Sequence, residues 1–142
     1  MTVASILRLK GRDIVTLPPH RTISEAARTL SDRRIGAIVI AGSDGSIAGI
    51  LSERDVVRAL AADGAQALDH PVSRHMTVKV ETARESDTVH EIMERMTAGK
   101  FRHIPVVEGG ALAGIVSIGD VVKHRLAEME AEARAMRDYI SA

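Results

Sequence analysis

Apolar residues follow two kinds of spacing along the chain, one typical of helices and one of buried strands. Apolar positions spaced i, i+3, i+4 and i+7 predict helices over residues 22–33 and 88–98. The apolar runs at 37–40 and 104–107 do not alternate with polar residues, which indicates strands covered on both faces. The expected strands are 14–17, 35–41, 47–51, 78–82, 103–107 and 111–116, and two further helices are expected to begin at Glu53 and Ile118.

These elements repeat within the chain. Residues 48–57 align with residues 113–122 at an offset of 65, and seven of the ten pairs are identical (Ala, Gly, Ile, Ser, Asp, Val and Val). Upstream the offset becomes 66, and the change falls in the turns, where Asp44-Gly45 and Gly109-Gly110 offer the positive φ that a tight hairpin needs. The order β-α-β-β-α therefore occurs twice, and each copy is small for a core of its own, so we expect the copies to pack on each other.

The second copy continues into an apolar stripe near the C-terminus. The stripe has heptad spacing and predicts a long helix with one apolar seam. The seam could pack on the body of the same chain or on a partner chain, and the pattern alone leaves both open. Its residues are Val122, Leu126, Met129, Ala133, Met136 and Ile140.

Composition excludes several classes of protein. The 142 residues include no Cys, so disulfides are not expected. The 19 basic side chains balance the 19 acidic ones, so no net positive charge attracts nucleic acid. Only two residues are aromatic, so a platform for stacking nucleic-acid bases is not expected. No apolar run reaches the roughly 20 residues that span a bilayer, and the N-terminal apolar patch is too short and charged for a secretory signal, so we expect a cytoplasmic protein. Neither a dinucleotide-binding glycine motif nor a phosphate-binding loop is complete.

The six histidines do not have the i, i+4 spacing of a helical zinc site with a supporting Glu, and His70 and His75 are five apart. We therefore expect no metal site. Nothing marks a nucleophile elbow either, so no catalytic residues are expected.

Four Ser/Thr-x-x-Asp/Glu patterns precede the predicted helices. Thr22…Glu25 and Thr88…Glu91 are best interpreted as capping boxes. Ser52…Asp55 and Ser117…Asp120 could be capping boxes too. Each also follows an apolar strand with a central glycine, where a helix N-terminus suits a phosphate and an Asp can accept the two hydroxyls of a ribose.

The last two patterns lie in segments that resemble the signature of the cystathionine-β-synthase (CBS) domain: GILSERD at 49–55, GIVSIGD at 114–120 and, before the latter, FRHIPVV at 101–107. The resemblance covers about residues 3–126 and implies a tandem CBS pair (Bateman module), here stand-alone and of bacterial type. It implies an α/β (α+β) fold of two β-α-β-β-α motifs in a pseudo-two-fold pair, with a long C-terminal helix. The expected boundaries are 1–66, 67–126 and 127–142 for motif 1, motif 2 and the helix extension.

The resemblance also implies two ligand clefts, each combining residues of both copies. The first cleft would use Val15, Thr16, Ile35, Gly36, Ala37, Ser117 and Asp120. The second would use Val80, Thr82, Arg102, His103, Ile104, Pro105, Ser52, Arg54 and Asp55. The first copy lacks the His-x-Pro of the second, and Gly119 stands where the first copy has Arg54, so the clefts could differ in ligand or occupancy.

The implied ligand is AMP or another adenosine nucleotide (ADP, ATP or NAD(H)), with S-adenosylmethionine ranked below them. The expected function is regulatory, non-enzymatic energy sensing. Ligand binding in the clefts would change the conformation of the module, and an unknown partner protein would recognise that change. The resemblance also favours a homodimer. Neither nucleic acid nor a membrane is expected as a binding partner. The alternative is a scaffold or interaction protein with vestigial clefts that acts through its C-terminal helix.

Overall fold

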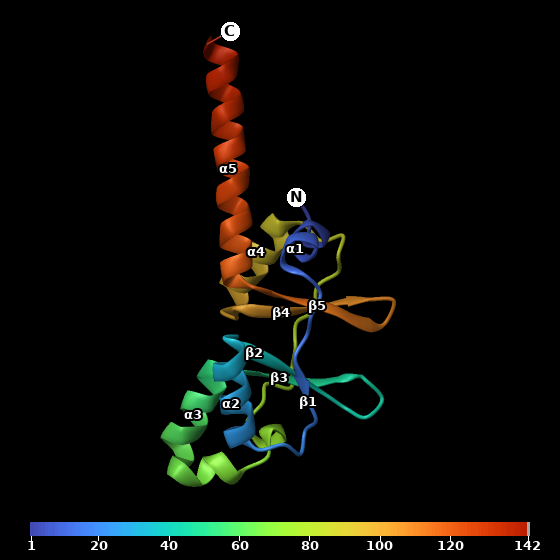
Figure 1. Cartoon of the computed structure of the whole chain (residues 1–142), viewed down its shortest axis with the longest axis vertical. Coiled ribbons are helices and arrows are strands. Elements are labelled where there is room, and N and C mark those ends of the chain that lie inside the picture. The colour runs from blue at the N-terminus through green and yellow to red at the C-terminus, as the bar shows by residue number, and fades with distance from the viewer. Residues whose placement is uncertain (142) are drawn as a thin grey trace. The chain divides into compact units, whose positions relative to one another are not determined.

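A computed structural model describes residues 1–141 as a mixed α/β fold (Figure 1). The predicted strand at 78–82 is wrong, because that stretch is irregular, and the helix α1 was not predicted. The elements are α1 (Val3–Lys10), β1 (Thr16–Leu17), α2 (Ile23–Arg33), β2 (Ala37–Ala41), β3 (Ile47–Ser52), α3 (Glu53–Asp63), the 3₁₀ helices η1 (Gly64–Asp69) and η2 (Val72–Arg74), α4 (Val89–Gly99), β4 (His103–Glu108), β5 (Ala111–Ser117) and α5 (Ile118–Ser141).

The chain divides into two compact units. The first-repeat unit consists of residues 13–81 and 109–112, and the second-repeat unit consists of residues 1–12, 82–108 and 113 onward. The unit boundaries do not coincide with the repeat boundary at 66/67, because the N-terminal helix joins the core of the second-repeat unit and residues 67–81 stay with the first.

A three-stranded sheet organises the first-repeat unit. Strand β1 pairs in parallel with β2, and β2 pairs antiparallel with β3. Helix α2 begins after Thr22, whose side chain accepts a hydrogen bond from the Glu25 N–H, as the capping pattern predicted. The buried core of this unit is Ile23, Ala26, Leu30, Ile38, Ile40, Leu51 and Val72.

The second-repeat unit is built on the two-stranded sheet β4–β5. Where the first repeat has strand β1, this unit has a single parallel bridge between Ala83 and Val106. Helix α1 buries Val3, Ile6 and Leu7 in the core, and Gly11, with a φ of 96°, follows its last turn. The other buried core residues are Ala83, Val89, Ile92, Met96, Ile104, Val106, Val116 and Val121.

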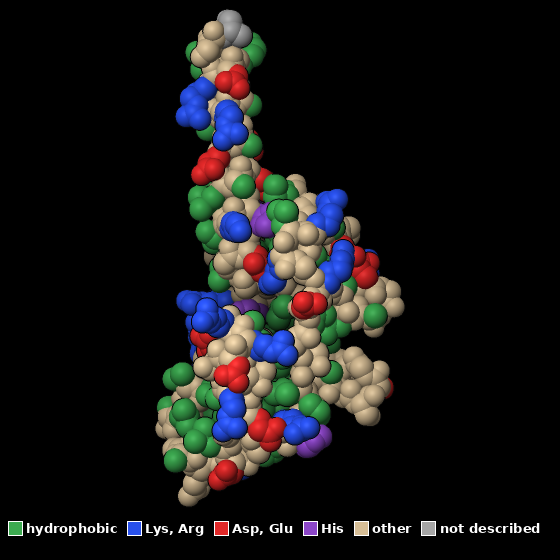
Figure 2. All heavy atoms as spheres, in the orientation of Figure 1, with side chains coloured by type: hydrophobic (Ala, Val, Ile, Leu, Met, Phe, Trp, Pro, Cys, Tyr) green, Lys and Arg blue, Asp and Glu red, His purple; other side chains and the backbone are tan. Residues whose placement is uncertain are grey.

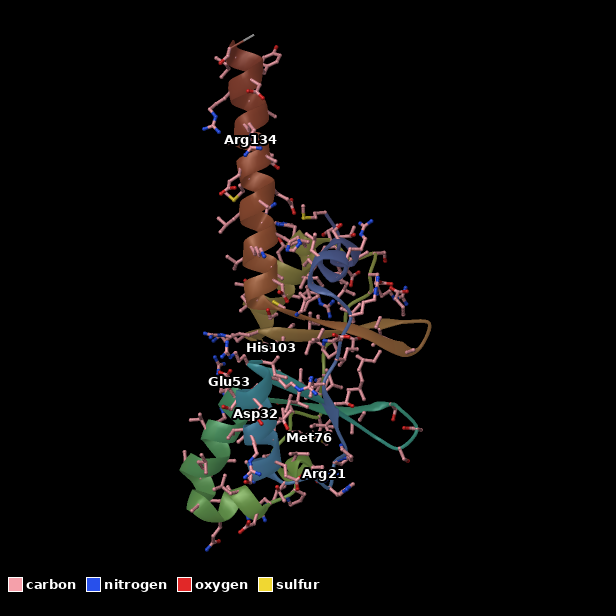
Figure 3. All side chains as sticks on the ribbon, in the orientation of Figure 1. Arg21, Asp32, Glu53, Met76, His103 and Arg134 are labelled. Carbon is pink, nitrogen blue, oxygen red and sulfur yellow. The ribbon has the colours of Figure 1, made fainter. Side chains whose placement is uncertain are left out.

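A glycine in β3 and its repeat partner in β5 both allow close packing. A Cβ on Gly49 would lie 2.7 Å from Met76 Sδ and 2.8 Å from the Thr77 carbonyl oxygen, and Figure 3 shows Met76 in this unit. A Cβ on Gly114 would lie 2.7 Å from a methyl carbon of Leu7. In each unit the glycine therefore allows a neighbouring segment to pack closely against the sheet strand.

Helix α5 confirms the predicted long C-terminal helix. Its first turns pack against α1 and α4, and the rest extends away from both (Figure 1). From Leu126 onward the second-repeat unit leaves the apolar seam uncovered: Leu126 and Met129 are each 54% exposed, Met136 60% and Ile140 74%. Figure 2 shows apolar side chains along this projecting helix, interspersed with charged ones. Within residues 1–141, no helix combines the length and apolar character needed to cross a membrane.

Candidate functional site

Ser52 and Asp55 form a reciprocal cap where β3 runs into α3. The Ser52 N–H donates to Asp55 Oδ2 at 2.9 Å, the Ser52 hydroxyl lies 3.1 Å from the same oxygen, and the Asp55 N–H donates to Ser52 Oγ at 3.3 Å. Asp55 is only 8% exposed. The capping interpretation is thus confirmed here, and it fixes the carboxylate at the helix N-terminus.

Ser117 and Asp120 repeat this arrangement where β5 runs into α5. The corresponding distances are 2.9, 3.0 and 3.2 Å. In both caps one carboxylate oxygen, Oδ2, receives these bonds. Among residues 1–141, no side chain or backbone group donates to the other oxygen, Oδ1. Each cap therefore keeps an acceptor that can receive hydroxyl groups from a ligand.

A second backbone contact recurs beside each cap. The Glu53 N–H donates to the Gly36 carbonyl at 3.0 Å, and the Ile118 N–H donates to the Arg102 carbonyl at 2.8 Å. Gly36 and Arg102 are equivalent positions of the repeat. The start of the middle strand of each repeat is therefore tied to the first residue of the helix that carries the aspartate.

These contacts bring predicted residues of the first-repeat unit close together, and we name this group the first half-site of the candidate site. Ala37 pairs with Ser52 across the sheet, and the Val15 carbonyl accepts from the Val39 N–H at 3.3 Å. The first half-site contains Val15, Thr16, Ile35, Gly36, Ala37, Ser52, Arg54 and Asp55. Val80, also in this unit, lies in the irregular stretch before Glu81.

The second-repeat unit assembles its predicted residues in the same way. The Pro105 carbonyl accepts from the Ala83 N–H at 2.9 Å, and the Thr82 carbonyl accepts from Arg95 at 2.8 Å. Ile104 is fully buried, whereas Arg102 is exposed. The second half-site contains Thr82, Arg102, His103, Ile104, Pro105, Ser117 and Asp120.

Lys10 is a residue of the second half-site that sequence reasoning missed. Its ammonium lies 2.6 Å from Asp120 Oδ2. Partial burial raises the pKa of the Asp120 carboxyl, but the Lys10 hydrogen bond and charge and the Ser117 hydrogen bonds outweigh burial and hold that pKa below its ordinary value of 3.8. Within residues 1–141 Asp55 has no such lysine, so the two aspartates differ in charge environment.

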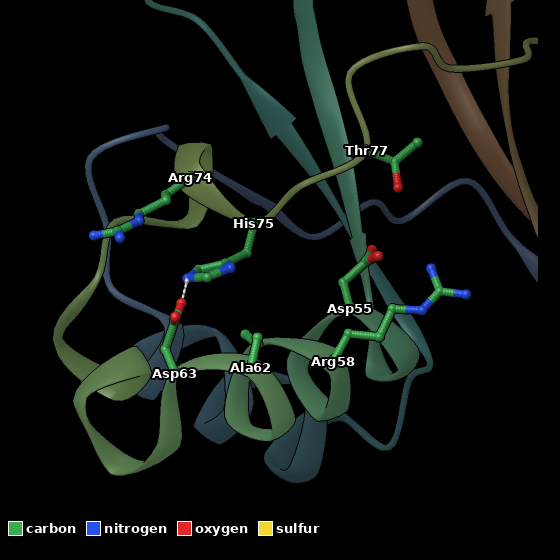
Figure 4. A pocket seen from close by; sticks show the side chains of 8 residues that line it. Asp55, Arg58, Ala62, Asp63, Arg74, His75 and Thr77 are labelled. Atoms are coloured by element: carbon green, nitrogen blue, oxygen red, sulfur yellow. Dashed lines mark ion pairs between the residues drawn. The ribbon is translucent and has the colours of Figure 1, made fainter.

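A pocket of about 530 Å³ adjoins the first half-site (Figure 4). One wall is a face of α3, from Asp55 at its start to Asp63 at its end, and the other wall is the segment after η1. Two arginines, Arg58 and Arg74, and two aspartates, Asp55 and Asp63, line it, so the charges in the lining balance. We call it the α3 pocket; its lining residues are Asp55, Arg58, Ala59, Ala62, Asp63, Arg74, His75 and Thr77.

Comparison with known proteins decides the family. The family model for the CBS domain matches this chain twice, over residues 6–62 and 72–127. The chain belongs to the CBS-domain family. A CBS pair is in general a regulatory ligand-binding module rather than a catalytic one.

Solved CBS structures share this fold. A CBS-domain containing protein from Agrobacterium tumefaciens has a TM-score of 0.86 and 50% identity, covering 88% of this chain and 99% of its own. A CBS domain protein from Pyrobaculum aerophilum, complexed with AMP, has a TM-score of 0.75 and 32% identity, covering 84% and 89%. The CBS domain pair of protein MJ0100, in complex with 5′-methylthioadenosine and S-adenosyl-L-methionine, has a TM-score of 0.80 and 26% identity, covering 90% and 98%.

Curated CBS relatives can be much longer. A CBS domain-containing protein from Arabidopsis thaliana is 34% identical over 127 residues, which make up 89% of this chain and 23% of the relative. The chain therefore spans about a quarter of such relatives.

Proposed function

We propose that this CBS pair is a regulatory module that binds an adenosine-containing ligand through its two Ser-x-x-Asp caps. The observation that carries this proposal is the geometry repeated in both units, in which a cap fixes the aspartate and leaves Oδ1 open. Adjacent ribose hydroxyls can both donate to such a carboxylate, and the helix N-terminus beside it favours a phosphate.

The preferred ligand is AMP or another adenosine nucleotide, ADP, ATP or NAD(H), ahead of S-adenosylmethionine. The complexes of the Pyrobaculum protein and of MJ0100 support the adenosine moiety. The exposed guanidinium groups of Arg54 and Arg102 support a phosphate-bearing ligand over a neutral nucleoside. As the family resemblance implies, each cleft would draw on both repeats, with Ser52, Arg54 and Asp55 serving one cleft and Ser117 and Asp120 the other.

The mechanism is differential binding rather than catalysis. A nucleotide that binds one conformation of the module more tightly shifts the population toward that conformation. A regulated partner protein then binds the two conformations differently. We propose a homodimer that associates through the uncovered seam of α5, because exposed Leu126, Met129, Met136 and Ile140 at heptad spacing form an apolar stripe that a second helix would bury. The cytoplasm, where adenine nucleotides are abundant, is the compartment that fits this role.

The same stripe supports the alternative function, a scaffold whose clefts are vestigial and whose activity resides in α5. The two proposals differ in what nucleotide does. A sensor must bind it, whereas a scaffold associates through α5 regardless of it.

A thermal-shift panel tests the sensor proposal. Protein stripped of co-purified nucleotide is titrated with AMP, ADP, ATP, NAD⁺, NADH, S-adenosylmethionine and adenosine. A ligand that binds only the folded state raises Tm by mass action. We expect at least one phosphate-bearing ligand to raise Tm more than adenosine does. If none of the panel raises it, the clefts are vestigial and the scaffold function stands.

A further inference from the structure

Two histidines and an aspartate converge beside the α3 pocket. His70 Nδ1 lies 3.0 Å from His75 Nε2, and Asp63 Oδ2 lies 3.8 Å from the first nitrogen and 3.9 Å from the second. One potential ligand atom from each residue falls within 4.8 Å of the others. Figure 4 shows the Asp63 and His75 side chains directed toward each other.

The fold brings these residues together by a route that helical spacing does not describe. Asp63 ends α3, and Gly64, with a φ of 68°, starts the 3₁₀ helix η1 that reverses the chain. His70 follows η1 and His75 follows η2, so neither histidine lies within a helix. The five-residue separation that argued against a metal site on a helix therefore does not apply to this turn.

The backbone holds both histidines in place. The His70 carbonyl accepts from the Ile23 N–H at 2.9 Å, and the His75 N–H donates to the Val72 carbonyl at 3.0 Å. Val72 and Ala67 are completely buried and anchor the two turns in the core. The imidazoles thus start from an ordered backbone, which reduces the conformational entropy that ligand binding would cost.

The separations suit a small coordination sphere. Metal–ligand bonds of 2.0–2.1 Å at tetrahedral angles set ligand atoms about 3.4 Å apart. The nitrogen pair is slightly closer than this, and the carboxylate oxygen is slightly farther away. The Asp63 side chain is 36% exposed, so it can move inward, whereas the side chains of His70 and His75 are 17% and 12% exposed.

We propose that Asp63, His70 and His75 bind a divalent transition-metal ion, with Zn²⁺ the best match, and that the ion fastens the end of α3 to the segment before Thr77. Two imidazole nitrogens and one carboxylate favour zinc over Mg²⁺ or Ca²⁺, which prefer oxygen ligands throughout. Water would complete the sphere. The alternative is a metal-free pair of stacked imidazoles, with ring centroids 5.2 Å apart, joined by one hydrogen bond.

The test uses the metal alone, so it is independent of nucleotide binding. The 142-residue chain is treated with a chelator, and Zn²⁺ affinity is then measured by competition with a chromophoric chelator. We expect a micromolar or tighter site in the wild type, weakened at least about tenfold by His70→Gln, His75→Gln and Asp63→Asn. His90→Gln is the matched control, because that exposed histidine pairs with Glu94 on α4 and should leave the affinity unchanged.

Two further readouts separate a lost ligand from lost folding. Circular dichroism of the metal-free variants checks that they fold, and Co²⁺ should give visible ligand-field bands in the wild type and His90→Gln but not in His75→Gln. Zn²⁺ should also raise the Tm of the wild type and not that of folded His75→Gln. The proposal is overturned if the wild type binds Zn²⁺ no more tightly than about 100 μM, or if the three variants keep wild-type affinity.

Discussion

Lys10 and Asp120 form an ion pair between residues 110 positions apart in the sequence, with Nζ 2.6 Å from Oδ2. The pair joins α1 to the first turn of α5 and occupies one oxygen of an aspartate that we propose as a ligand-binding residue. The first half-site has no counterpart among residues 1–141, so the two caps are alike in geometry and different in charge.

This pair makes stability depend on pH. The folded-state pKa of Asp120 lies below 3.8, so its contribution to the free energy of unfolding is fully present above that pH and is lost as pH falls through the folded-state pKa. We expect Lys10→Met to lower the free energy of unfolding by roughly 0.2–1 kcal/mol at pH 7, as for partly exposed ion pairs.

Urea unfolding at pH 7 and near pH 3 measures that difference. The gap between the wild type and Lys10→Met should shrink as the pH falls below 3.8, because the protonated fraction of Asp120 rises as the pH approaches its folded-state pKa and a neutral carboxyl does not attract the lysine. Lys79→Met, at an exposed lysine of the first-repeat unit, should match the wild type at both pH values. A gap that widens toward pH 3 would contradict the ion-pair account.

The two equivalent glycines should tolerate a methyl group unequally. In Gly49→Ala the Cβ would meet the Thr77 carbonyl oxygen, which is held by a hydrogen bond from the Ile50 N–H at 2.9 Å. We expect a loss of about 1–3 kcal/mol in the free energy of unfolding. In Gly114→Ala the obstacle is the flexible end of Leu7, so the loss should be smaller.

Gly119→Ala is the matched control for this pair. Its Cβ would meet nothing closer than Ser117 Oγ at 3.6 Å, and alanine is the better helix former, so it should be neutral or stabilising. Denaturant unfolding of the three variants gives the order. If Gly49→Ala and Gly114→Ala lost equal free energy of unfolding, the close backbone packing against Gly49 in β3 would not explain the cost of the substitution.

The effects of capping and of ligand binding can be separated by comparing two N-cap residues, Ser52 and Thr88. Ser52→Ala and Thr88→Ala each remove the side chain of a capping box and should each cost about 0.5–2 kcal/mol of stability. Only Ser52→Ala should also reduce nucleotide affinity, because Thr88 is outside the proposed half-sites. Chemical unfolding and calorimetric titration test the two effects, and an equal loss of affinity in both variants would assign it to general destabilisation.

The seam of α5 should determine self-association. Met136→Glu places a charge on the exposed seam and should shift a dimer toward monomer. Ala135→Glu adds the same charge at the neighbouring position, which lies off the seam, and should leave the dimer intact. Sedimentation analysis distinguishes these results, and a dimer that survives Met136→Glu does not use this seam.

Much of the fold could be predicted because it rests on local pattern. The repeat fixed the starts of α3 and α5 at Glu53 and Ile118, and the turns at Gly45 and Gly109-Gly110 have the positive φ expected. The stretch 78–82 resembled a strand by composition but makes no regular pairing; bridges form instead at Thr77 and Ala83.

The missed features depend on distant contacts. The spacing of Val3, Ile6 and Leu7, followed by Gly11, could have revealed α1, since it is helical and ends in a stop signal. The ion pair between Lys10 of α1 and Asp120 had no such signal in the sequence, because the two residues are 110 positions apart. His70 and His75 meet through two 3₁₀ turns whose path no periodicity encodes.

The most direct test of the central claim is calorimetric titration of nucleotide-stripped protein with AMP, comparing the wild type with Asp55→Ala, Asp120→Ala and the capping control Glu91→Ala. Hydrogen bonds to a charged group contribute about 1.5–3 kcal/mol, so loss of either aspartate should weaken its site about tenfold or more, while Glu91→Ala binds as the wild type does. If AMP binds and both aspartate variants retain wild-type affinity and stoichiometry, the Ser-x-x-Asp caps do not hold the ligand and the account fails.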